Sequence, residues 1–312
     1  MSISSSTKVG YLGPRGTFTE QALLSQPDLA AAEHHPIGSI PDALHALVSG
    51  AVDLAFVPIE NGIEGAVNVT QDTLTFDIDV IIQREIVLDI QFNLLALPGS
   101  SLDEIHTVLS YPVALAQCRR FLRERLPDAT VDVAGSTADA ARRIGEGQLR
   151  GVAAISSPLA ADLYSLEPVA EAVEDHTGNQ TRFLLLAREG IAPATGHDKT
   201  SVVVYQRANQ PGSLLAILQE FAARSINLMR LESRPTRQGL GDYCFVLDME
   251  GHVESELVGD CLRELKMTQG DVKFLGSYPA AGAKGDQARR DSDANWQSAN
   301  DWLASVRNDI QT

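Results

Sequence analysis

Short apolar runs alternate with segments of helical periodicity along about the first 190 residues of the chain. We expect strands at 9–12, 54–57, two within 80–97, and at 107–109, 131–133, 152–155 and 182–187, and helices from Thr17 and at 42–48, 68–74, 112–126, 138–144 and 158–163. This alternation is typical of an α/β fold with mainly parallel sheets. If the chain builds one lobe, crosses to a second lobe and then returns, two hinge strands and a cleft lie between the lobes.

A different pattern follows residue 188. Residues 189–199 contain Gly190, Pro193 and Gly196 and show no periodicity, which indicates a linker. Apolar runs then predict strand 200–205, helix 211–224, strands 226–234 and 242–249, helix 254–265 and strand 272–278. This βαββαβ order is that of a ferredoxin-like sandwich. The sequence thus divides into a domain at 8–188, the linker 189–199, a second domain at 200–279 and a flexible tail at 280–312 with one short helix near 296–306.

Charge and composition exclude several classes of binding partner. Lys and Arg number 25 against 41 Asp and Glu, a formal charge of −16, so the chain lacks the excess of cations that nucleic acid or an anionic membrane surface attracts. No apolar stretch approaches a membrane span and no secretory signal is visible, so we expect a cytoplasmic protein. Cys118, Cys244 and Cys261 have no metal-ligand spacing, and His34 and His35 fall in a predicted loop without partners. The sequence therefore predicts no metal centre.

Polar residues stand at the ends of three predicted strands. The turn at 13–17 precedes a helix, so its N–H groups can bind a carboxylate, although a purely structural turn fits the pattern equally well. Asn61 follows a strand at the edge where open α/β sheets collect ligands, and its amide both donates and accepts, but it can also serve the turn alone. Ser110 ends a third strand and Gln117 lies in the next helix, where a helix cap and a surface amide are the alternatives.

The segment 175–183 is denser in polar groups than a connection requires. Thr181 offers a hydroxyl that can hydrogen-bond a leaving hydroxyl or pass on a proton late in bond cleavage. Arg182 is the best candidate to pair a carboxylate through two hydrogen bonds. Alternatively, Arg182 bridges a surface Asp and Phe183 belongs to the core.

Four motifs stand in order along the chain. They are Tyr11-Leu12-Gly13-Pro14 with Gly16-Thr17-Phe18, then Pro58-Ile59-Glu60-Asn61, then Asn179-Gln180-Thr181-Arg182-Phe183, and then Glu232-Ser233-Arg234-Pro235. In sequence and spacing they resemble the prephenate dehydratase family with a C-terminal ACT regulatory domain. The resemblance covers Val9 to Tyr278 and implies a two-lobed, periplasmic-binding-protein-like catalytic domain. It also implies conversion of prephenate to phenylpyruvate, water and carbon dioxide, in L-phenylalanine biosynthesis and without a cofactor.

The resemblance assigns roles to individual residues. Thr181 is the implied catalytic hydroxyl, and the implied substrate-binding residues are Thr17, Asn61, Ser110, Gln117, Asn179, Arg182 and Phe183. The ACT unit is implied to bind L-phenylalanine as allosteric effector, between protomers of a homodimer or homotetramer. The implied effector residues are Gly212, Ser213, Leu214, Asn227, Leu228, Glu232, Ser233 and Arg234.

Three positions depart from the family pattern. Tyr111-Pro112-Val113 replaces a frequent His-Pro-Gln, Gly135 replaces a glutamate that some members carry, and Gly178 replaces one Asn of a common pair. That glutamate therefore cannot be a general acid here. Arogenate, which has an amine in place of the keto group, remains an alternative substrate, and a non-enzymatic binding protein remains an alternative function.

Overall fold

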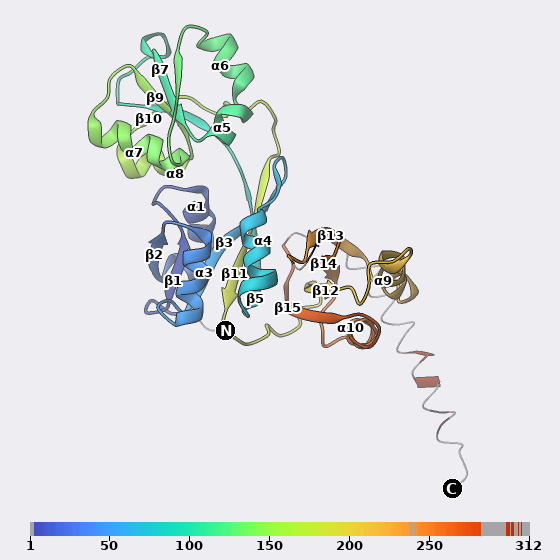
Figure 1. The fold of residues 1–312 in the computed structure, drawn as a ribbon. Helices are drawn as coiled ribbons and strands as arrows, with labels where there is room; N and C mark the ends of the chain where they lie inside the picture. The colour runs from blue at the N-terminus through green and yellow to red at the C-terminus, as the bar shows by residue number, and fades with distance from the viewer. Residues whose placement is uncertain are drawn as a thin grey trace. The chain divides into compact units, whose positions relative to one another are not determined.

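The protein is described by a computed structural model that covers residues 3–237, 239, 241–281, 298–299, 301–302, 305 and 307. The chain forms two compact units (Figure 1). Unit 1 contains the residues up to Thr73 together with Ile86–Leu185, and unit 2 contains Leu74–Glu85 and the residues from Leu186 onward. The predicted tail at 280–312, including its short helix, lies largely outside the described residues.

The first sheet has the strand order β2-β1-β3-β11-β5 and belongs to unit 1, except for residues 81–85 of β5 and 186–187 of β11, which unit 2 includes. Its strands are β1 (Lys8–Leu12), β2 (Glu33–Ile37), β3 (Leu54–Asn61), β5 (Ile81–Asp89) and β11 (Gln180–Ala187), and β4 (Gly65–Ala66) pairs with β3. The helices of this lobe are α1 (Phe18–Leu24), α2 (Pro27–Ala30), α3 (Ile40–Ser49) and α4 (Asn68–Asp72), which continues as a π-helix at Thr73–Asp77. In α3 the buried residues Ile40, Ala43, Leu44 and Leu47 recur at helical spacing, so one face packs inward.

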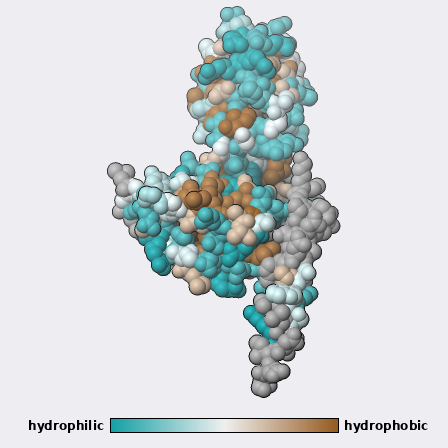
Figure 2. All heavy atoms as spheres, turned by 90° about the vertical axis from the view of Figure 1, so that its right-hand side faces the viewer, coloured by the Kyte–Doolittle hydropathy of each residue, from teal (hydrophilic) through white to brown (hydrophobic). Residues whose placement is uncertain are grey.

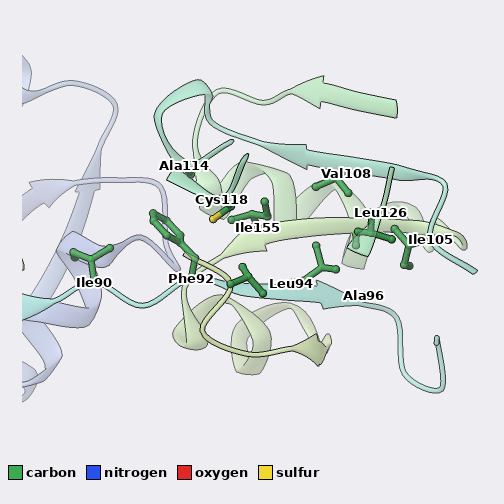
Figure 3. Close-up of a cluster of buried hydrophobic side chains, with 12 residues drawn as sticks. Ile90, Phe92, Leu94, Ala96, Ile105, Val108, Ala114, Cys118, Leu126 and Ile155 are labelled. Atoms are coloured by element: carbon green, nitrogen blue, oxygen red, sulfur yellow. The ribbon is translucent and has the colours of Figure 1, made fainter. Parts of the chain in front are cut away.

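A second sheet in unit 1 has the order β10-β6-β9-β7-β8. Its strands are β6 (Asn93–Ala96), β7 (Thr107–Ser110), β8 (Thr130–Val133), β9 (Val152–Ser156) and β10 (Glu167–Ala170), and its helices are α5 (Pro112–Gln117), α6 (Arg119–Arg125), α7 (Thr137–Gly147) and α8 (Pro158–Tyr164). Figure 3 shows the core on one side of this sheet, where Phe92, Leu94 and Ile155 surround Cys118. Burial raises the pKa of the Cys118 thiol, which therefore stays neutral as a core residue.

The chain path confirms the predicted two-lobed α/β fold. It crosses from the first sheet to the second between β5 and β6 and returns between β10 and β11. The returning strand β11 lies between β3 and β5. Residues far apart in the sequence therefore become neighbours at the start of β11.

Unit 2 contains the predicted βαββαβ order. Its elements are β12 (Asp198–Tyr205), α9 (Ser213–Ala223), β13 (Leu228–Pro235), β14 (Tyr243–Glu250), α10 (Glu256–Thr268) and β15 (Asp271–Pro279), and the antiparallel sheet has the order β13-β14-β12-β15. Val202, Phe245 and Leu247 from the sheet pack with Phe221 and Leu265 from the helices. This confirms the ferredoxin-like sandwich.

The segment Leu74–Glu85 joins unit 2, which the sequence pattern did not indicate. The Tyr205 hydroxyl donates to the Thr75 carbonyl at 2.7 Å, and Lys199 Nζ lies 2.9 Å from both carboxylate oxygens of Glu85. Both side chains of this ion pair are more than nine-tenths buried.

Three local predictions are wrong. His34 and His35 lie in the edge strand β2, paired with β1, and His34 Nε2 lies 2.7 Å from the Leu29 carbonyl. The predicted helix 112–126 is broken at Cys118 into α5 and α6. Tyr111, not Ser110, is the N-cap residue of α5, and it makes no side-chain capping bond.

Hydrophilic side chains dominate the molecular face drawn in Figure 2, with hydrophobic residues in small groups. Among the residues that the structure describes, no helix has the length and apolar content needed to cross a membrane.

Candidate active site

The strand pairing of unit 1 brings Thr181 beside Asn61, 120 positions earlier in the chain. Asn61 ends β3 and Thr181 is the second residue of β11, and Asn61 Nδ2 donates to Thr181 Oγ1 at 2.8 Å. Asn61 Oδ1 accepts from the backbone N–H groups of Ile63 and Glu64, each at 3.0 Å. These two bonds fix the amide orientation, because an N–H donor must face an oxygen.

This orientation determines what the Thr181 hydroxyl can do. Its oxygen receives a hydrogen bond from Asn61, so its own proton points elsewhere. Among the described residues no acceptor takes that proton. Thr181 is 9 % exposed, so the hydroxyl is a largely buried donor.

A second amide chain lies in the same unit and connects the two lobes. Asn179 Nδ2 donates to Gln117 Oε1 at 3.0 Å, and Gln117 Nε2 donates to Glu64 Oε1 at 3.2 Å. Asn179 and Gln117 are buried, whereas Glu64 is exposed. Glu64 is not among the residues predicted from the sequence, although its position in the turn after Asn61, at the carboxyl end of β3, is a signal that points to it.

Arg182 and Phe183 do not accompany the Thr181 hydroxyl as predicted. Successive strand residues point to opposite faces, so Arg182 lies on the other face of β11 from Thr181. Its Nη1 lies 3.5 Å from Glu60 Oε2, so it pairs with an acid as in the alternative interpretation, although that acid is a Glu and not the expected Asp. Phe183 is 1 % exposed and stacks on Phe56 with ring centroids 5.4 Å apart. Phe183 therefore packs in the core of the sheet, as in the alternative interpretation of this residue.

Ser110 and the 13–17 turn also make internal contacts. The Ser110 hydroxyl is fully buried and donates to the Ile155 carbonyl at 2.6 Å. Thr17 Oγ1 accepts from the Glu20 N–H, and the Glu20 carboxylate accepts from the Gly16 N–H. A carboxylate from the chain itself thus binds one N–H of the turn, at Gly16, where the sequence predicted that a substrate carboxylate could bind.

The Glu20 carboxylate also accepts from the Tyr11 hydroxyl at 2.9 Å. Burial, reinforced by the nearby Glu20 charge, raises the pKa of Tyr11 far above its ordinary value. Tyr11 therefore remains a neutral donor that holds Glu20 in place. This cluster is a structural support for the turn.

A separate hollow of about 830 Å³ lies between the 13–15 and 36–38 turns and residues of α7 and α8. None of the predicted substrate residues lines it. Within the described parts of the chain, no three His, Cys, Asp or Glu side chains are grouped so that they could hold a metal ion.

The predicted effector residues lie on two elements of unit 2. Gly212 is the N-cap of α9 with φ of +88°, a conformation that favours glycine, and Ser213 Oγ donates to Gln206 Oε1 at 3.1 Å. Leu214 packs against the core, and Asn227 is exposed just before β13. The strand β13 carries Leu228, Glu232, Ser233 and Arg234 at the edge of the sheet.

Fold and site together define a two-lobed α/β domain with a hydroxyl–amide site, followed in sequence by a ferredoxin-like βαββαβ unit. The sequence profile described as prephenate dehydratase matches residues 9–191, and the ACT domain profile matches residues 200–266. The chain belongs to the prephenate dehydratase family and carries an ACT domain.

Individual relatives resemble nearly the whole chain. A prephenate dehydratase of Mycobacterium bovis (strain BCG / Pasteur 1173P2) is 41% identical, covering 96% of this chain and 94% of its own length. One from Mycolicibacterium vanbaalenii is 43% identical, covering 92% and 96%. The crystal structure of prephenate dehydratase from Arthrobacter aurescens in complex with L-Phe superposes with a TM-score of 0.84 at 38% identity, covering 97% of this chain and 100% of that chain.

Proposed function

We propose that this chain converts prephenate to phenylpyruvate, carbon dioxide and water, with Thr181 as the proton-donating hydroxyl. The observation that carries the proposal is the fixed amide of Asn61, which bonds the Thr181 oxygen and leaves the hydroxyl proton available. Asn61, Gln117 and Asn179 supply uncharged hydrogen-bonding groups around it. Family membership supplies the reaction, and the geometry supports the role of Thr181.

The steps balance with one proton from solvent. The bond between the ring and its carboxylate breaks, carbon dioxide leaves, and the electron pair enters the ring as the C–O bond to the hydroxyl breaks. The departing oxygen takes a proton from Thr181 Oγ1 and leaves as water, and Thr181 then regains a proton from solvent. A hydrogen bond to the departing oxygen strengthens as negative charge grows on it, so it lowers the barrier more than it tightens substrate binding.

A turnover assay on purified protein tests this function. Prephenate should be consumed with ultraviolet detection of phenylpyruvate, and the same protein should be assayed on arogenate. A higher kcat/KM on prephenate supports the proposal, whereas a higher value on arogenate would assign the alternative substrate. Binding of prephenate without turnover would leave only the non-enzymatic function.

Regulation by L-phenylalanine through the ACT domain is the second part of the proposal. It is supported by the ACT profile at 200–266 and by the L-Phe complex of the Arthrobacter aurescens relative. The backbone at Gly212 is open, since an added Cβ there would meet no atom within 4 Å, so a ligand can approach it closely. Calorimetric titration with L-phenylalanine tests the assignment, and an absence of heat in the active enzyme would contradict it.

Assembly into a homo-oligomer, a homodimer or homotetramer, completes the proposal. The strand β13 is an edge strand, and its side chains Met229 and Leu231 are 47% and 42% exposed. An edge with exposed apolar side chains favours pairing with a second copy. Light scattering with and without L-phenylalanine measures the mass, and a monomer under both conditions would contradict this part. Localisation in the cytoplasm, where this biosynthetic reaction is expected, is part of the same proposal.

A further inference from the structure

The hydrogen bonds that join Glu64, Gln117 and Asn179 fix the orientation of both amide side chains. Glu64 contributes a carboxylate, which only accepts hydrogen bonds, so the Gln117 amide must turn its NH₂ group toward Glu64 Oε1. Gln117 Oε1 then faces the NH₂ group of Asn179, at 3.0 Å. The Asn179 oxygen is consequently turned away from Gln117.

Within this network of Glu64, Gln117 and Asn179, the Asn179 oxygen lacks a hydrogen-bond donor. Asn179 is 4 % exposed, and its Oδ1 has no hydrogen-bond partner among the described residues. A buried acceptor without a donor costs about 1–3 kcal/mol of stability. The position is close to the turn that carries Asn61, because a Cβ added at Gly62 would lie 3.9 Å from Asn179 Oδ1.

Prephenate has one group that can satisfy a buried acceptor. Its two carboxylates and its keto oxygen only accept, and the ring hydroxyl alone carries a proton to donate. Asn179 directly precedes β11, and Thr181 is the second residue of that strand. Asn61 bonds Thr181, and the neighbouring Gly62 lies beside Asn179 Oδ1, so both side chains lie at the same turn. A hydroxyl held there can donate to Asn179 Oδ1 while it accepts from Thr181.

We propose that Glu64 is a positioning residue that, through Gln117, holds Asn179 Oδ1 as the acceptor for the leaving hydroxyl of the substrate. With its proton directed to Asn179, the hydroxyl presents a lone pair to Thr181 Oγ1, which is the alignment that proton donation requires. Glu64 itself does not touch the substrate. This inference rests on the proposed function, because it concerns the same leaving group.

The experiment compares Glu64→Ala with Glu64→Gln in the full-length protein. Each variant is measured for kcat/KM on prephenate and for the inhibition constant of phenylpyruvate, which lacks the ring hydroxyl. The matched control is Asp89→Ala, which removes a carboxylate bonded to the amide of Gln180 at 2.7 Å, on the opposite face of β11. A general disturbance of the strand would weaken substrate and product alike.

For Glu64→Ala we expect kcat/KM to fall about tenfold while the phenylpyruvate inhibition constant stays within about twofold, since only the hydroxyl contact is lost. Glu64→Gln retains an acceptor oxygen and should stay within about threefold of wild type, and Asp89→Ala within about twofold. An unchanged kcat/KM in Glu64→Ala would overturn the inference, as would a parallel loss of phenylpyruvate affinity. Failure of the proposed function is distinct, because the wild type itself would then not turn over prephenate.

Discussion

Two buried polar networks of this chain differ in whether their hydrogen bonds are complete. In unit 2 the Thr200 hydroxyl lies 2.7 Å from the Gly251 carbonyl and 2.6 Å from Ser277 Oγ, and Ser201 Oγ donates to Asp248 Oδ1 at 2.6 Å. In unit 1 the Thr181 hydroxyl receives a bond from Asn61, and no described residue accepts its proton. We call the network of Thr200 and Ser201 closed, because each hydroxyl has hydrogen-bond partners, and the network of Thr181 incomplete, because its hydroxyl proton has no acceptor among the described residues.

The difference separates stability from chemistry. A satisfied buried network stabilises one arrangement of its groups, whereas an unsatisfied donor or acceptor costs free energy in the unliganded protein. Such a cost is retained where a ligand completes the network. We therefore expect substitutions in the closed network to change unfolding, and substitutions in the incomplete network to change turnover.

The largest expected effect follows from removing the Thr181 hydroxyl. Thr181→Ala should lower kcat by about 10²–10⁴, because a positioned proton-transfer group is lost, with a smaller change in KM. Thr181→Ser keeps the hydroxyl and is the matched control. Steady-state kinetics measures the turnover of each variant, and a thermal melt measures its stability. Near-normal kcat in Thr181→Ala would remove Thr181 from the mechanism.

Breaking the buried ion pair between Lys199 and Glu85 in unit 2 should lower stability and leave turnover nearly unchanged. Lys199→Met leaves the Glu85 carboxylate, whose side chain is 1 % exposed, without its cation. We expect the free energy of unfolding to fall by about 3–5 kcal/mol, while kcat of the folded enzyme changes little. Denaturant unfolding measures the loss. Adding Glu85→Leu to Lys199→Met should restore much of the stability, and a double variant as unstable as the single one would contradict this account.

A single-atom exchange at Asn61 tests the proton assignment itself. Asn61→Asp keeps an oxygen for the N–H groups of Ile63 and Glu64, but its second oxygen can only accept, so it would bind the Thr181 proton. We expect kcat to fall about 10²-fold without a large change in unfolding. The measurement is kcat of the variant beside its melting temperature. Full activity in Asn61→Asp would show that the hydroxyl proton is not needed.

The sequence was sufficient for the fold because each element has a strong local pattern. Alternating strands and helices predicted two lobes, and six short elements predicted the βαββαβ unit. The edge strand β2 was missed, since Glu33–Ile37 contains two histidines and a proline and has no apolar run. The break at Cys118 within the predicted helix 112–126 carries no glycine or proline that would mark it.

The site was predictable only in part, because its contacts join distant segments. The pairing of Asn61 with Thr181 depends on where β11 enters the sheet, which no local pattern encodes. The separation of Thr181 from Arg182 was predictable, because neighbours on a strand point to opposite faces. The contact of Glu20 with the 13–17 turn was not predictable, because its carboxylate reaches back to the Gly16 N–H, which spacing along the chain does not specify.

The smallest expected effect is a loss of stability of unit 2 as the pH rises. Cys261 is fully buried in the core of unit 2, and burial raises its pKa from an ordinary value of 9.0 to about 12. Between these values the unfolded chain releases the thiol proton while the folded chain keeps it, so the unfolded state binds fewer protons and stability falls as pH rises. The contribution is about 2 kcal/mol at pH 10.5 relative to pH 8. Denaturant unfolding at both pH values should show a smaller drop for Cys261→Ala than for wild type. Equal drops would show that Cys261 does not contribute, and would leave Tyr205, whose pKa burial raises to about 12, as the group to test next.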